Sequence, residues 1–363
     1  MKRLFLILSI FLINQLYAQT GYSNDSPVNA LHDYPKGISE VIFSMTNDFP
    51  NNTQLSIAII ENNKTSFYGI IKTNDTIKPI KNQNKVFEIG SITKIFTSNI
   101  LASFVEDDKI KLTDPINSYF PFNFNNSTII TFKDLANHTS GLSRLPENLD
   151  LSNGINPYKN YGKRQLEEYL KNHLNLENGI KKSYSYSNLG TGLLGYTLGL
   201  VENTSIQELI QRLVFDKYKM CNSYTKPNSL DSIIVKGQNS KGEIASNWDW
   251  DVLFGAGGAL STTEDLAKFA AAQFNPINTE LALTKIPTFT INENMKIGLG
   301  WHILKSNKGE DVFVHNGGTG GYSSSIAINI DEKKAVIILS NLSGFHEKMG
   351  TIEKLCLHLH SNN

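Results

Sequence analysis

The stretch that most restricts what this chain can fold into runs from residue 87 to residue 104 and reads FEIGSITKIFTSNILASF. Apolar residues recur in it at helical spacing, at positions 92, 95, 96, 100, 101 and 104. An apolar stripe this wide predicts a helix that is buried on most sides. Gly90 gives the backbone freedom just before that helix.

Ser91 and Lys94 lie three residues apart, so a helix places them on one face with Cβ atoms about 5–6 Å apart. A lysine on a buried helix is costly unless its ammonium group finds partners or loses its proton. An amine in that state can activate a serine one turn away. The pair is therefore a candidate nucleophile and base.

The Ser-x-x-Lys pattern is short, and about one match is expected by chance in a chain of this length. A second match joins Ser223 to Lys226. Pro227 follows it and no apolar helix stands behind it, so we interpret this match as a loop. The local context favours Ser91.

A second candidate is Tyr186-Ser-Asn188, which opens the small-residue run LGTGLLG. The same pattern occurs at Tyr22 and Tyr158, in segments that read as a polar tail and a loop. A lysine cation nearby would lower the pKa of a tyrosine from about 10, so we expect Tyr186 and Lys94 to form a proton relay. The alternative is a half-buried tyrosine with a satisfied hydroxyl group, next to a capping asparagine.

A third candidate is the segment from His315 to Tyr322, HNGGTGGY, between two expected strands. Glycines here let a substrate approach the backbone closely. His315 is a candidate anchor for a substrate carboxylate. The alternative is a structural histidine at a strand end, followed by an ordinary turn.

Strand patterns stand at both ends of the chain, and helical patterns fill the middle. The expected strands are 55–60, 66–71, 298–304, 311–315, 323–330 and 334–340, with a last helix over 346–360. This order predicts an antiparallel sheet flanked by helices and built from both termini, with a helical insertion.

Composition narrows the class of function. The chain has 34 basic and 34 acidic residues and no basic run longer than a pair, so no nucleic-acid partner is expected. Cys221 and Cys356 lie far apart in sequence, and small buried thiols are the expectation for them. We expect no metal site and no cofactor.

The first residues resemble an export signal. Lys2 and Arg3 precede an apolar run over 4–13, and Ala18 ends a cleavage site, so residues 1–18 are expected to be a signal peptide. The run is too short to cross a bilayer comfortably, so we expect no stable membrane anchor.

Taken together, FEIGSITK, Tyr186-Ser-Asn188 and His315-Asn-Gly317 resemble, in this order, the three motifs of class C β-lactamase-related serine hydrolases. This family includes D-alanyl-D-alanine carboxypeptidases and esterases. Residues 135–142 and 255–265 also resemble family segments, and the similarity covers about 55–340.

The resemblance implies an α/β (α+β), serine β-lactamase-like fold. Its α/β domain would comprise 19–106 and 251–363, and its all-helical domain 107–250, with the active site in the cleft between them. The pocket loops would be 144–157 and 248–251, which carry no pattern that names the substrate.

It also implies roles. Ser91 would form an acyl-enzyme, and Lys94 with Tyr186 would activate it and protonate the leaving group. The remaining expected residues bind substrate: Asn188, His315, Gly317 and Gly318, the last supplying an oxyanion-hole N–H together with Ser91.

One departure bears on the substrate. β-Lactamases of this class usually have Lys-Thr-Gly in the third motif, whereas His-x-Gly is commoner in the related peptidases and esterases. We expect a periplasmic or secreted bacterial enzyme that cleaves an amide in a β-lactam or a D-amino-acid peptide, which makes its partner a small-molecule or peptidoglycan-like substrate. An esterase, or a penicillin-binding sensor that acylates without turnover, are the alternatives.

Overall fold

The computed structural model describes residues 27–152, 154–176, 183–227 and 230–361. The expected signal peptide, 1–18, lies outside these ranges. Within them, no helix has both the length and the apolar character that a membrane span requires.

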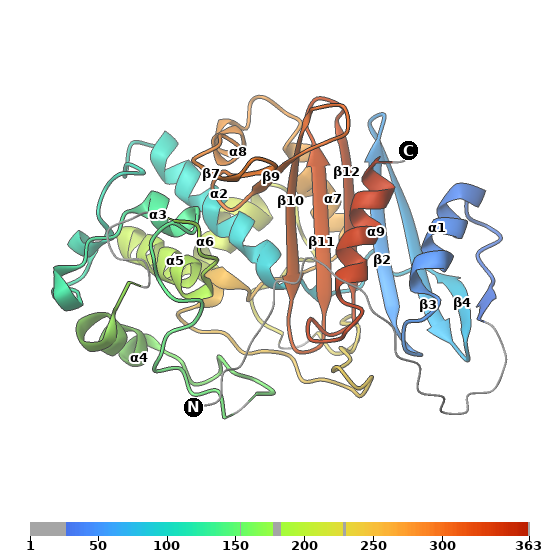
Figure 1. The fold of residues 1–363 in the computed structure, drawn as a ribbon, viewed down its shortest axis with the longest axis horizontal. Helices are drawn as coiled ribbons and strands as arrows, with labels where there is room; N and C mark the ends of the chain where they lie inside the picture. The colour runs from blue at the N-terminus through green and yellow to red at the C-terminus, as the bar shows by residue number, and fades with distance from the viewer. Residues whose placement is uncertain (1–26, 153, 177–182, 228–229, 362–363) are drawn as a thin grey trace.

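The centre of the molecule is a ten-stranded sheet in the described residues (Figure 1). Its order is β1 (Val28–Asn29), β4 (Thr76–Ile80), β3 (Lys64–Thr73), β2 (Gln54–Glu61), β12 (Lys334–Ser340), β11 (Ser323–Asn329), β10 (Asp311–Gly318), β9 (His302–Lys305), β8 (Met295–Ile297) and β7 (Phe289–Asn292). Neighbours are antiparallel, apart from the parallel pair β1 and β4. Strands from the two ends of the chain meet where β12 pairs with β2. The expected antiparallel sheet is thus confirmed.

The strands expected over 55–60 and 66–71 are present as β2 and β3, and they form a hairpin that pairs from Gln54 with Ile71 to Glu61 with Lys64. Asn62 and Asn63 form its turn with φ angles of 51° and 59°. Asparagine adopts this left-handed conformation more readily than most residues, which explains why the chain reverses here.

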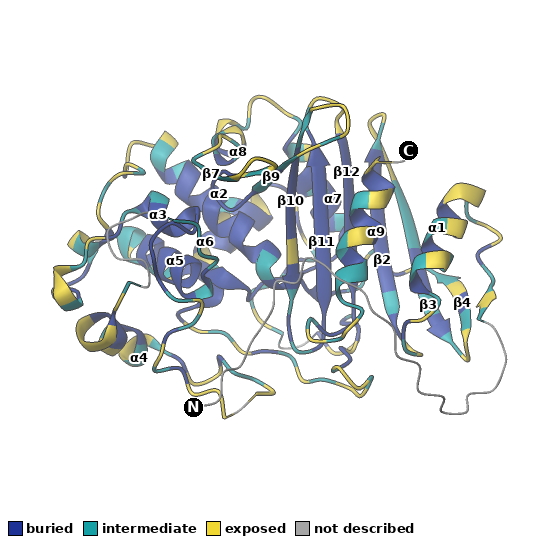
Figure 2. Cartoon of the chain, in the orientation of Figure 1, coloured by how far each residue is buried: buried dark blue, intermediate teal, exposed yellow. Residues whose placement is uncertain are grey.

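Helices cover both faces of the sheet. α1 (Lys36–Thr46) and α9 (Gly350–Ser361) pack on one face, where Ile338 of β12 joins their apolar side chains. The neighbouring Ile337 points the other way, into the larger core around α2 (Thr93–Glu106) and α7 (Thr263–Ala272). The central strands are therefore buried on both sides (Figure 2). α9 begins at residue 350, four residues later than the pattern predicted.

Between 107 and 250 the described residues form helices, loops and isolated β-bridges. The longer elements are α3 (Phe132–Ala136), α4 (Lys163–Glu168), η4 (Tyr169–His173), α5 (Asn188–Glu202), α6 (Ile206–Ile210) and η5 (Gln211–Asp216). Ile234 and Gln238 bridge to Val86 and Leu342 beside the sheet, so part of this stretch packs on the α/β side. The domain boundaries at 106 and 250 stay predictions.

α2 is buried as expected. It packs against α5, α6, α8 (Thr279–Thr284) and η6 (Phe254–Ala256). Its Phe96 makes edge-to-face contacts with Phe215 and Phe269, at ring-centroid distances of 5.7 and 5.1 Å. A single 3₁₀ turn, η1 (Gly90–Ile92), leads into it, so Ser91 lies just before the α-helix.

Candidate active site

Ser91 lies on a turn that is pressed against the end of β10. Gly90, which precedes it, has a φ of +51°, and a Cβ added there would lie 2.7 Å from the backbone nitrogen of Gly318. The carbonyl oxygen of Ile89 accepts a 2.8 Å hydrogen bond from Ser324 Oγ on β11. Only glycine fits this close approach, so Gly90 fixes where Ser91 meets the sheet.

Lys94 is fully buried one turn into the same segment. Its Nζ lies 3.1 Å from Ser91 Oγ, 2.8 Å from Asn188 Oδ1 and 2.6 Å from the carbonyl oxygen of Ala256. Burial holds the pKa of Lys94 well below its usual value, and the charge of Arg144 lowers it further. The structure therefore favours the neutral amine.

A neutral Lys94 has two N–H groups and one lone pair. The oxygens of Asn188 and Ala256 can only accept, so they take the two N–H groups. The lone pair is then left for the third neighbour, Ser91 Oγ. This arrangement can remove the proton from Ser91.

Tyr186 lies beside this pair, just before α5. Its ring centre is 5.0 Å from Lys94 Nζ. Burial raises the pKa of Tyr186 to about 12, against the opposing effects of a hydrogen bond with Ser91 and the charge of Arg144. The expectation that a lysine cation would lower this pKa is wrong, because desolvation dominates and Lys94 itself tends to be neutral. Tyr186 keeps its proton near neutral pH.

Asn188 connects Lys94 to an aromatic wall. Its Nδ2 donates a 3.2 Å hydrogen bond to the hydroxyl group of Tyr158, whose ring stacks on Trp250 at 3.9 Å. Asn188 contacts Lys94 through Oδ1, and the cap of α5 is not Asn188 but Ser187, whose Oγ accepts from Gly190 N. Tyr158, which the pattern alone placed in an ordinary loop, is therefore part of the site.

His315 lies on β10 and is only 2% exposed. Its Nδ1 is 2.7 Å from the carbonyl oxygen of Asn316, which can only accept, so Nδ1 carries the proton. Burial, followed by the nearby His302 and Lys94, holds the pKa of His315 well below its usual value. A histidine with its pKa lowered in this way is neutral near pH 7, so His315 offers no positive charge to a substrate carboxylate.

The two glycines after it form the floor of the site. A Cβ on Gly317 would lie 2.1 Å from the carbonyl oxygen of Ile89 and 2.9 Å from Ser91 N. Thr319 N donates to the Tyr322 carbonyl oxygen across the β10–β11 turn, so these two residues form a hydrogen-bonded pair. In an antiparallel ladder such pairs alternate with pairs that are not hydrogen-bonded, so the N–H of Gly318 points away from β11. The pairing with β9 ends at Val314, which leaves this edge of β10 without a strand partner among the described residues. The N–H groups of Ser91 and Gly318 are thus neighbours.

Two further residues contact Tyr186, and sequence reasoning assigned a role to neither of them. His138 has its ring 4.5 Å from that of Tyr186, and the Cζ atom of Arg144 is 5.0 Å from the same ring. His138 lies in the family-like segment 135–142, and Arg144 is the first residue of the expected pocket loop 144–157. These contacts join residues more than forty positions apart in sequence, because the loop that carries His138 and Arg144 packs against the start of α5.

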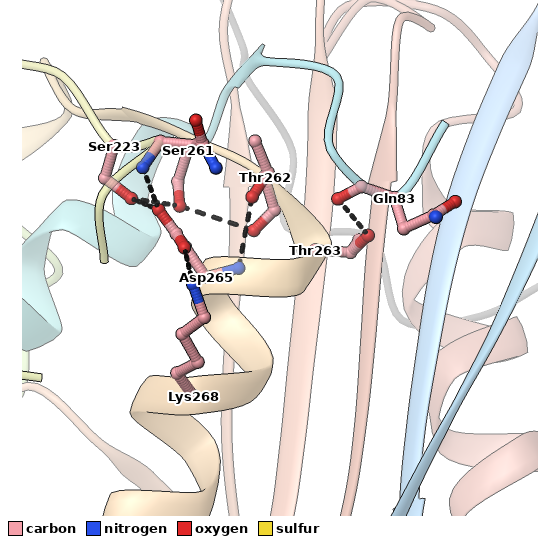
Figure 3. Close-up of polar contacts among 8 residues, drawn as sticks. Gln83, Ser223, Ser261, Thr262, Thr263, Asp265 and Lys268 are labelled. Atoms are coloured by element: carbon pink, nitrogen blue, oxygen red, sulfur yellow. Dashed lines mark hydrogen bonds and ion pairs between the residues drawn. The ribbon is translucent and has the colours of Figure 1, made fainter. Parts of the chain in front are cut away.

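Ser223, the other Ser-x-x-Lys match, has a structural role (Figure 3). It is buried in a loop, where Oγ donates to Asp265 Oδ2 at 2.9 Å and contacts Ser261 Oγ at 2.9 Å. Asp265 also pairs with Lys268. Lys226 is exposed, so the interpretation of this match as a loop is confirmed.

Within the described ranges, the structure also places the two cysteines. Cys221 and Cys356 are both free, but Cys221 is exposed rather than buried as expected. In the same ranges, no three histidine, cysteine or acidic side chains are grouped as metal ligands.

The fold and this catalytic arrangement define a serine hydrolase. Residues 52–355 match the model of the family described as Beta-lactamase, and the chain belongs to that family. A β-lactamase of Pseudomonas fluorescens is 24% identical over 276 residues, 73% of each chain. Protein flp of Staphylococcus aureus strain MRSA252 is 24% identical over 336 residues, 84% of this chain and 62% of flp.

Solved structures show the same fold. The β-lactamase/D-alanine carboxypeptidase of Pseudomonas syringae superposes with a TM-score of 0.73 at 22% identity, over 90% of this chain and 100% of that one. A class C β-lactamase of Rhodobacter sphaeroides gives a TM-score of 0.73 at 18% identity, over 90% and 99%. The expected β-lactamase-like fold and the family are thus confirmed.

Proposed function

We propose that this chain is an exported serine hydrolase that cleaves an amide, in a β-lactam or a D-amino-acid peptide, through an acyl-enzyme on Ser91. One observation carries the proposal. Lys94 Nζ lies 3.1 Å from Ser91 Oγ while two carbonyl oxygens occupy its other hydrogen-bonding capacity. A buried amine held in this way is a base aimed at one serine.

The reaction follows from the arrangement of the site. Ser91 Oγ attacks the scissile carbonyl carbon and its proton passes to Lys94. The N–H groups of Ser91 and Gly318 stabilise the negative charge on the carbonyl oxygen. Tyr186 donates its proton to the leaving nitrogen and takes a proton back from Lys94. Water then releases the acyl group from Ser91.

An amide is favoured over an ester because an amide nitrogen must be protonated before it can leave, whereas an alkoxide leaves more easily. Tyr186, with a pKa raised to about 12, carries the needed proton through the neutral range. The β-lactamase of Pseudomonas fluorescens among the relatives agrees with an amide substrate. An ester is the second candidate, on the ground of the His-x-Gly motif at His315.

Intact-mass measurements test the chemistry. The full chain would be incubated separately with benzylpenicillin, an N-acetyl-D-alanyl-D-alanine peptide and p-nitrophenyl acetate. We expect an adduct on Ser91 that decays as product forms, and no adduct in Ser91→Ala. Ser223→Ala is the matched control and should label normally. Turnover of the ester alone would indicate an esterase, and a stable penicillin adduct without product would indicate a sensor.

Export is a separate part of the proposal, based on Lys2, Arg3 and the apolar run that follows. Mass spectrometry of protein recovered outside the bacterial cytoplasm should find the chain beginning at Gln19. A chain that stays in the cytoplasm and begins at its first residue would contradict export, but it would not contradict the proposed reaction at Ser91.

A further inference from the structure

Hydrogen bonds fix the backbone of Arg144 at the edge of the site. Its carbonyl oxygen accepts hydrogen bonds from the backbone nitrogens of Asn188 and Leu189, at 3.0 and 3.2 Å. The preceding residue is held as well, because Ser187 Oγ donates to the carbonyl oxygen of Ser143 at 2.7 Å. The backbone of Arg144 is therefore tied to the first turn of α5, which also carries Asn188.

The side chain of Arg144 reaches the catalytic tyrosine and remains open to solvent. Its Cζ is 5.0 Å from the centre of the Tyr186 ring, and the residue is exposed. No carboxylate among the described residues forms an ion pair with it. An aromatic ring under the guanidinium group orients it without neutralising its charge.

Burial disfavours a positive charge on the other basic groups around Tyr186. Burial lowers the pKa of Lys94, His138 and His315 well below their usual values, and that of His302 to about 4. Arginine keeps its charge at any physiological pH. Among the described residues that surround Tyr186, Arg144 is thus the lasting positive charge, and it acts on Lys94, His138, Tyr158 and Tyr184 as well.

We propose that Arg144 binds a carboxylate of the substrate and so makes this hydrolase selective for acids over their neutral analogues. This rests on the proposed function, since it concerns the substrate of the Ser91 site. The planar guanidinium group matches a carboxylate with two parallel hydrogen bonds. Arg144 takes the role that the sequence had suggested for His315, which is buried and neutral. The anchor is a specificity residue, and it takes no part in the proton transfers.

Binding measured without turnover gives the first test. In a Ser91→Ala background, calorimetry would compare benzylpenicillin with its methyl ester, and N-acetyl-D-alanyl-D-alanine with its C-terminal carboxamide. We expect the acids to bind more tightly. Adding Arg144→Gln should weaken binding of the acids by about 10–100-fold, the range for a charge-assisted hydrogen-bonded pair, and leave the neutral analogues within about twofold.

Two variants control for folding and charge. Arg164→Gln removes another exposed arginine, on α4, and should leave the preference unchanged. Arg144→Lys keeps the charge but not the planar fork, so it should restore part of the acid affinity.

Equal losses for acid and neutral ligands in Arg144→Gln, or acids that bind no better than their neutral analogues in the Ser91→Ala background, would overturn the role of Arg144. In an otherwise wild-type chain, formation of the Ser91 adduct with p-nitrophenyl acetate tests the proposed hydrolase separately. An acid preference that depends on Arg144, in a chain that never acylates Ser91, would support the anchor while refuting the proposed hydrolase.

Discussion

The imidazole ring of His138 lies 4.5 Å from the ring of Tyr186, tilted by 37°. His138 has a φ of 59°, a conformation that most side chains avoid. This conformation lets one residue bond to both sides of the tyrosine: its carbonyl oxygen accepts from Ser185 N at 2.8 Å and its Nδ1 from Ser187 N at 3.2 Å. His138 thereby holds the backbone on both sides of Tyr186, at Ser185 and Ser187, and also packs against its ring.

His138→Asn and His138→Phe separate these contacts. Asparagine tolerates the left-handed conformation and keeps an acceptor for Ser187, whereas phenylalanine keeps the ring and loses the acceptor. If the backbone bonds position Tyr186, kcat for an amide should fall by less than about tenfold in His138→Asn and by about 10–100-fold in His138→Phe, with KM little changed. Steady-state kinetics check this, and the reverse order of the two variants would assign the effect to the ring contact.

Gly90→Ala should damage the oxyanion hole and the fold together. The added methyl group would lie 2.7 Å from the Gly318 nitrogen, at a φ of +51°. We expect a loss of about 1–3 kcal/mol in the free energy of unfolding and a lower acylation rate. Gly37→Ala is the control, because nothing lies within 4 Å of its added Cβ and α1 accepts alanine readily. Urea unfolding compares the stabilities of the two variants, and equal stabilities would refute the close approach at Gly90.

The pH dependence of acylation should follow Lys94. Burial lowers its pKa, so the folded chain keeps the amine neutral to a lower pH than a free lysine, and the amine gains a proton as the pH falls through the lowered value. The value of kcat/KM should therefore decrease on the acid side. A profile that instead rises only near pH 10 would show a lysine that is charged in the folded enzyme.

Tyr186→Phe should affect amides more than esters. Loss of the proton donor should lower acylation by an amide about 10²–10⁴-fold, the usual contribution of a general acid or base. Acylation by p-nitrophenyl acetate, whose leaving group departs without a proton, should change much less. Equal effects on both substrates in stopped-flow acylation would assign Tyr186 to the activation of Ser91 instead.

The buried histidines should make the fold sensitive to acid. The pKa of His302 is lowered from 6.5 to about 4, mainly by burial, and its Nε2 lies 2.7 Å from the hydroxyl group of Tyr184. The unfolded chain binds this proton near pH 6.5 and the folded chain does not, so stability present above pH 6.5 is lost as the pH falls toward 4. The loss for His302 is about 3 kcal/mol at 1.36 kcal/mol per pKa unit.

Thermal unfolding between pH 7.5 and 4.5 measures this effect. His302→Gln should flatten the fall in Tm, whereas substitution of the exposed His32 by Gln should keep the wild-type slope. An unchanged slope in His302→Gln would contradict the buried neutral state.

The parts of the candidate site that could be predicted are those in which the residues lie close together in the sequence. Ser91, Lys94 and the helix behind them follow from one stretch of sequence, and Tyr186 with Asn188 from another. The pKa of Tyr186 could not be predicted, because it depends on how deeply the folded chain buries the ring. The expected pocket loop 144–157 includes Arg144, but its contact with Tyr186 could not be predicted, because an exposed arginine in a loop has no pattern that shows which ring it will meet.

The pairing of β12 with β2 also affects how the protein is made. One edge of β2 pairs with β3 nearby in sequence, but its other edge pairs with residues 334–340 and must wait until they leave the ribosome. Contacts this distant in sequence form slowly and leave apolar strand edges open in the meantime. We therefore expect chaperones and proteases to have their longest access to this chain before residues 334–340 are synthesised. A truncation that removes β12 should yield a degraded product.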